Sequence, residues 1–109
     1  SRILAYLDAH WLDQIPTYFE IENLINWNGP FIAIIDDFEI EKEPLYKFDR
    51  YGDRKIGKEI VPNATDISVW VTNYPANLET GARRGTGIVM NIPALARLSE
   101  ETLKLIEKI

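Results

Sequence analysis

The segment that most constrains the fold is Phe31-Ile32-Ala33-Ile34-Ile35-Asp36-Asp37-Phe38, in which five apolar residues run without a break into two adjacent carboxylates. An unbroken, Ile-rich run predicts a strand that is buried on both faces, as in a parallel sheet. The preceding residues, 26–30, read Asn-Trp-Asn-Gly-Pro and are typical of a turn. Because ligands of open α/β sheets bind at the carboxyl ends of strands, Asp36 and Asp37 are candidate functional residues.

A second apolar run, residues 3–7, also ends in an acid, Asp8. Between the two runs, Thr17-x-x-Glu20 fits a capping box, and apolar residues recur at helical spacing over residues 17–27. This segment predicts an amphipathic crossover helix. Strand, helix and strand of these lengths predict a right-handed βαβ unit.

The remaining segments predict two more strands and one more helix. Residues 67–72 alternate and are β-branched, and residues 85–90 follow a glycine-containing turn, so both are expected to be strands. Residues 39–66 lack a sustained period and carry many charges, which is typical of a long functional loop, with a helical turn at 55–61. Ser99, followed by two glutamates, predicts a last helix whose apolar face includes Leu103, Leu105 and Ile106.

Composition bounds the class of protein. At 109 residues the chain is one domain or part of one. A net charge of −5 argues against a nucleic-acid partner, since phosphate binding needs clustered Lys and Arg. Zero cysteines exclude disulfides and thiolate metal sites. No apolar stretch approaches membrane-spanning length, so we expect no membrane partner and a cytoplasmic location.

Three motifs occur in an order that points to a family. They are Leu7-Asp8-Ala9-His10-Trp11, then Ile35-Asp36-Asp37-Phe38 with its long acidic loop and Asp49-Arg50-Tyr51-Gly52, then residues 79–85, Glu-Thr-Gly-Ala-Arg-Arg-Gly. Over residues 3–91 the chain resembles the C-terminal half of a class I S-adenosylmethionine-dependent methyltransferase. It is most similar to the macrocin-type bacterial O-methyltransferases that act on sugars and natural products.

The resemblance implies an α/β fold that is half of a Rossmann-like seven-stranded sheet. Residues 3–7 and 31–35 would be its fourth and fifth strands and 67–72 its sixth, with 86–91 the antiparallel seventh inserted between the fifth and sixth. The glycine-rich cofactor loop of the family precedes these strands and has no counterpart here, and the Gly85-Thr86-Gly87 segment is no substitute. We therefore expect residues 1–109 to be a single partial domain, inactive alone, with residues 39–66 as an inserted loop on the acceptor side.

The resemblance also implies the site residues. Asp8, Asp36 and Asp37 match the family's metal site for Mg²⁺ or Mn²⁺, whose hard oxygen ligands suit the residue types. The competing interpretation is that Asp36 caps a turn and Asp37 is solvated or pairs with an arginine. Asp8 or His10 is the candidate catalytic base, and His10 is alternatively structural. Asp8 and Trp11 are candidate contacts of the S-adenosylmethionine cofactor, and Trp11 is alternatively a packing residue.

Aromatic and charged residues in the long loop suit an acceptor-binding lid, or else a surface loop with anchoring aromatics. The candidate acceptor-binding residues are Tyr46, Phe48, Asp49, Tyr51 and Arg83. Arg83 and Arg84 are expected either to clamp an anionic group of the acceptor, or to divide so that one ties the turn to Glu79 or Asp37 and the other is solvated.

The function expected first is metal-assisted O-methyl transfer to a hydroxyl of a small molecule, possibly a sugar. A second interpretation is a non-catalytic half-Rossmann module that assembles through the exposed sheet edge near residues 3–7, as a homodimer or with a missing N-terminal half. A third is a metal-dependent nucleotide-sugar glycosyltransferase, which gives no reason for the strand after residue 85.

Overall fold

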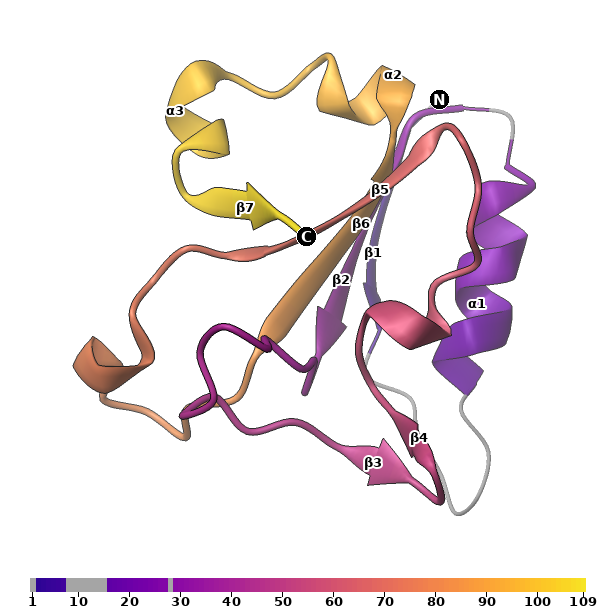
Figure 1. Cartoon of the computed structure of the whole chain (residues 1–109). Helices are drawn as coiled ribbons and strands as arrows, with labels where there is room; N and C mark the ends of the chain where they lie inside the picture. The colour runs from indigo at the N-terminus through magenta and orange to yellow at the C-terminus, as the bar shows by residue number, and fades with distance from the viewer. Residues whose placement is uncertain (1, 8–15, 28) are drawn as a thin grey trace.

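The structure, a computed structural model, describes residues 2–7, 16–27 and 29–109 (Figure 1). Its main sheet has five described strands in the order β1, β2, β6, β5, β7. Their bounds are Ile3–Leu7, Phe31–Asp36, Thr86–Asn91, Ile67–Thr72 and Ile106–Lys108. A small hairpin joins β3 (Arg50–Tyr51) to β4 (Arg54–Lys55). The helices are α1 (Pro16–Ile25), α2 (Ile92–Leu95) and α3 (Glu100–Leu103), with 3₁₀ turns η1 (Lys58–Ile60) and η2 (Ala76–Leu78).

The position of β6 decides the topology. β1 and β2 are parallel, whereas β6 lies antiparallel between β2 and β5. Val89 of β6 is in register with Ala33 on one side and with Val69 on the other. The βαβ unit and the inserted antiparallel strand are therefore confirmed, within a mixed α/β sheet of five described strands.

One face of the sheet carries the core. Phe31, Ala33 and Ile35 of β2 are fully buried on this face. Helix α1 supplies Ile21, and the segment after β2 supplies Ile40, Ile56 and Ile60. In Figure 1, α1 and the segment that carries β4 lie on the same side of the sheet.

The expectation that β1 and β2 are buried on both faces is wrong. In β2, buried residues alternate with partly exposed ones. In β1, Leu4 and Tyr6 are 72% and 64% exposed. The physical reason is that α1 and the loop cover one face only, so alternate side chains of both strands project from the other face.

Two glycines of the segment 85–87 allow β6 to approach Phe38. A Cβ on Gly87 would lie 2.4 Å from the Phe38 ring, and one on Gly85 would lie 1.9 Å from the Phe38 carbonyl oxygen. Phe38 is fully buried, and its N–H donates to the Gly85 carbonyl at 2.9 Å. These glycines thus serve close packing of β6 against Phe38.

Residues 39–66 and the C-terminal segment differ from their expected structures. The long loop contains the β3–β4 hairpin and η1, and it contributes to the core, so it is more ordered than expected. The last helix is shorter than expected: α3 ends at Leu103, and Leu105 is 68% exposed. Ile106 instead pairs with Thr72 of β5. The edge of β5 would otherwise be open, and its unpaired backbone groups can form hydrogen bonds with a segment that contains a β-branched residue.

Substituting Gly87 tests this packing. Gly87→Ala should lower the free energy of unfolding by about 1–3 kcal/mol, because the methyl group overlaps the buried Phe38 ring. Urea denaturation followed by circular dichroism measures the change, with the partly exposed neighbour Thr86→Ala as the control. Equal stability of Gly87→Ala and the wild type would show that the strand and the ring are not in this contact.

Candidate functional site

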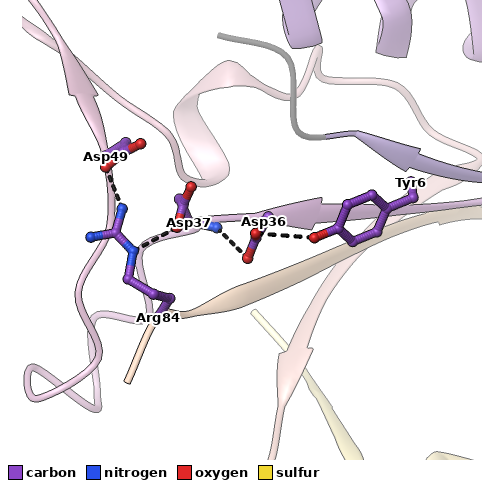
Figure 2. Close-up of polar contacts among 5 residues, drawn as sticks. All are labelled: Tyr6, Asp36, Asp37, Asp49 and Arg84. Atoms are coloured by element: carbon purple, nitrogen blue, oxygen red, sulfur yellow. Dashed lines mark hydrogen bonds and ion pairs between the residues drawn. The ribbon is translucent and has the colours of Figure 1, made fainter. Parts of the chain in front are cut away.

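The two acids at the carboxyl end of β2 point to different partners (Figure 2). Asp36 Oδ2 accepts a hydrogen bond from the Tyr6 hydroxyl at 3.0 Å, and Asp36 Oδ1 accepts one from the Asp37 N–H at 3.0 Å. Asp37 has a left-handed backbone with φ of 56°, which turns the chain away from the strand. The repulsion expected between adjacent carboxylates is reduced because each one accepts separate donors.

Arg84 is the cation that neutralises Asp37. Its Nε lies 2.6 Å from Asp37 Oδ1, and its Nη2 donates to Asp49 Oδ1. The hydrogen bonds from Arg84 to Asp37 and then to Asp49 raise the pKa of Arg84. Backbone hydrogen bonds align the same segments. Asp49 N–H donates to the Asp37 carbonyl at 3.0 Å, and the backbones of Lys47 and Arg84 form an isolated parallel β-bridge. The guanidinium therefore joins the end of β2, the loop after it and the approach to β6.

This arrangement bears on the expected metal site. Asp8 lies outside the described residues, and among the described residues no group of three or more His, Cys, Asp or Glu side chains is placed to hold a metal ion. Asp37 already faces a guanidinium, which opposes a second cation at the same carboxylate. Of the two described acids in the predicted set, Asp36 accepts hydrogen bonds from neutral donors, the Tyr6 hydroxyl and the Asp37 N–H.

The other predicted site residues are either outside the described residues, buried in the core, or partly exposed. His10 and Trp11, like Asp8, lie outside the described residues, and so does the side chain of Tyr51. Tyr46 is buried, and its hydroxyl donates to the Tyr74 carbonyl at 2.8 Å, so its ring belongs to the core. Burial raises the pKa of Tyr46, and the nearby Glu79 raises it further. Phe48 is partly exposed, with the Lys55 ammonium 5.9 Å from its ring centroid.

Arg83 and Arg84 have separate roles, as one of the two interpretations expected. Arg84 ties the turn to Asp37, whereas the exposed Arg83 donates from Nε to the Glu79 carbonyl at 3.0 Å. Arg83 also has a left-handed backbone, with φ of 53°. Asp49, a predicted acceptor contact, forms an ion pair with Arg84.

Sequence reasoning missed Tyr6 and Lys47. Tyr6 lies inside an apolar run that is read as buried, so its contact with Asp36 has no local signal. Alternation along β1 places Tyr6 on the same face as Leu4. The exposure of that face at β1 is known only from the structure. Lys47 belongs to a loop without a period, and only the pairing with Arg84 places it near the site.

Comparisons with known proteins give no match for this chain: no family model, no curated protein and no solved structure is similar to it. Within the described part of the chain, no helix has the length and apolar character needed to cross a membrane, and α1 has ten residues.

Replacing Arg84 tests its bridging role. Arg84→Gln should lower the free energy of unfolding by about 1–3 kcal/mol, since hydrogen bonds to charged groups are lost and two partly buried carboxylates remain near one another. Arg84→Lys should recover only part of the loss, because an ammonium lacks the planar fork that reaches both acids. Urea denaturation checks both, with the exposed Arg97→Gln as the control. A loss in Arg97→Gln equal to that in Arg84→Gln would contradict the bridge.

Proposed function

We propose that this chain is the C-terminal half of an S-adenosylmethionine-dependent O-methyltransferase that acts on a hydroxyl of a small molecule, possibly a sugar. The observation that carries the proposal is the strand order, with antiparallel β6 between β2 and β5. That order is what the resemblance implies for strands four to seven of the family's sheet. It supports the proposal because it follows from strand pairing, which is independent of the three sequence motifs.

The chemistry is proposed for the carboxyl edge of β1 and β2. Asp36, oriented there by Tyr6, would act with Asp8 as an oxygen ligand of Mg²⁺ or Mn²⁺. A bound divalent cation lowers the pKa of a coordinated hydroxyl. Asp8 or His10 would accept the proton of the acceptor hydroxyl, and Trp11 would contact the cofactor. Asp37 is proposed to hold Arg84 instead of the metal.

The metal-dependent nucleotide-sugar glycosyltransferase is less well supported. An acid pair after a strand suits both chemistries, but the antiparallel β6 is a feature that the methyltransferase resemblance implies. Binding of a nucleotide sugar, without binding of S-adenosylmethionine, would favour the glycosyltransferase.

The metal proposal predicts a carboxylate-dependent titration. Mn²⁺ should bind the chain saturably in isothermal titration calorimetry. Asp36→Asn should abolish the binding, because the neutral amide replaces a negatively charged carboxylate ligand. Asp53→Asn, which removes an exposed acid at the β3–β4 turn, is the matched control. Equal Mn²⁺ affinity in Asp36→Asn and the wild type would remove Asp36 from the site.

The second candidate function, assembly through the sheet edge, is favoured by a separate observation. β1 is an edge strand of the described sheet, and it carries no proline or charge between Ile3 and Leu7. Natural edge strands are normally protected by such residues. The exposed Leu4 and Tyr6 add apolar area next to that edge, which suits pairing with a second copy of the chain.

This assembly proposal predicts a concentration-dependent dimer. Light scattering after size-exclusion chromatography should show dimers that Leu4→Lys converts to monomers, since a charge at the edge opposes strand pairing. Leu105→Lys is the matched control, because Leu105 is similarly exposed but lies outside β1. A wild-type chain that stays monomeric at high concentration would count against this function.

A further inference from the structure

A cavity of about 650 Å³ lies where the segment after β5 faces the loop after β2. Leu45 and Lys47 line it from one loop, and Leu78, Glu79 and Arg83 line it from the other. The second loop joins the carboxyl end of β5 to β6, and in Figure 1 it carries the helical turn η2 well away from α1. Arg83, which lines the cavity, precedes Arg84, which contacts Asp37.

The cavity contains two cationic side chains, Lys47 and Arg83, and Arg83 Nε donates to the Glu79 carbonyl at 3.0 Å. Lys47 and Arg83 are both exposed, and in the described part of the chain neither forms an ion pair with a carboxylate. Arg84 beside them is bound to Asp37 and Asp49. The acid of the cavity, Glu79, accepts a hydrogen bond from the Gly81 N–H inside its own turn. In a chain of net charge −5, two such cations in one cavity favour an anionic ligand.

The cavity wall is held in place by contacts between the two loops. Lys47 N–H donates to the Arg83 carbonyl at 2.6 Å, and Gly85 N–H donates to the Lys47 carbonyl at 2.9 Å. The Tyr46 hydroxyl donates to the Tyr74 carbonyl beneath them. These bonds keep Arg83 at a φ of 53°, a backbone conformation that costs of order 1–3 kcal/mol for a residue with a side chain. Strained residues of this kind cluster at ligand sites.

Two exposed leucines give the cavity an apolar side. Leu45 and Leu78 are 53% and 56% exposed and come from opposite loops. A ligand that satisfies both sides has an apolar body and an oxyanion. We propose that this cavity binds an amphipathic small molecule that carries a carboxylate or a phosphate, with Arg83 and Lys47 as its anion contacts. That this small molecule is the methyl acceptor is an inference that rests on the proposed function.

Four probes separate the contributions to binding. Phenyl phosphate and benzoate carry both features and distinguish the two oxyanions, inorganic phosphate carries the anion alone, and benzyl alcohol carries the ring alone. In titrations followed by amide chemical shifts, phenyl phosphate or benzoate should bind more tightly than inorganic phosphate or benzyl alcohol. The shifts should fall at residues 45–47 and 77–83. Saturable binding elsewhere, or no saturable binding of any probe, overturns the proposal.

Variants assign the anion contacts. Arg83→Gln and Lys47→Gln should each weaken binding of the anionic aromatic probe about tenfold, as expected when a hydrogen bond to a charged group is lost. Arg97→Gln makes the same charge change away from the cavity and should alter affinity less than about twofold. Equal weakening by Arg97→Gln would show a nonspecific charge effect and overturn the proposal.

Arg83→Gly separates ligand binding from folding. Glycine adopts a positive φ without strain, so this variant should be as stable as the wild type or more stable in urea, yet it should lose ligand affinity like Arg83→Gln. Retained affinity in Arg83→Gly would overturn the role of the guanidinium. These titrations contain neither metal nor S-adenosylmethionine. A result that contradicts the ligand site is therefore distinct from a result that contradicts the methyltransferase proposal, which the Mn²⁺ titration tests.

Discussion

The central position of β6 is the constraint on which the rest of the described fold depends. A strand that enters between two others must satisfy backbone groups on both sides and fit its side chains against both neighbours. Each end of β6 is tied to β2. At one end, Gly85 and Gly87 admit Phe38. At the other, buried Asn91 accepts from the Phe31 N–H at 3.2 Å and donates to the Gly29 carbonyl at 2.8 Å.

Asn91 also caps the next element, accepting a hydrogen bond from the Ala94 N–H at 3.1 Å. One buried amide thus ends β6, starts α2 and satisfies the first residue of β2. Burying a polar side chain costs little when its partners are complete, and here each hydrogen bond also fixes the position of a chain segment. Packing of Phe38 against the glycines thus holds one end of β6, and the hydrogen bonds of Asn91 hold the other.

Local patterns predicted the elements whose structure depends on nearby residues. The β-branched run of β5 and the apolar run that ends in Asp36 and Asp37 both lie where expected. The capping residue Ser99 starts α3 as predicted, but the helix periodicity that follows it does not persist, because pairing of Ile106 with β5 is a contact between distant segments. The exposure of Leu4 was equally unpredictable, since an apolar run reads the same whether one face or two are covered.

The site follows the same division. Two acids at a strand end are visible in the sequence, and so is a nearby arginine pair. Which arginine binds which acid depends on a contact between Arg84 and Asp49 across 35 positions, and no local spacing encodes it. The two cationic residues of the cavity, Lys47 and Arg83, are similarly brought together by pairing of two loops.

The hydrogen bond between Tyr6 and Asp36 has a consequence for how the edge of the sheet and the acid pair relate. Tyr6 belongs to the edge strand, whereas Asp36 belongs to the strand beside it. A partner that reorients the edge therefore changes the donor seen by the carboxylate. If the proposed metal at Asp36 and the proposed partner at the edge both bind, and the metal competes with the Tyr6 hydroxyl, thermodynamic linkage requires each to change the affinity of the other by the same factor. The Tyr6 hydroxyl would then couple the acid site to the sheet edge.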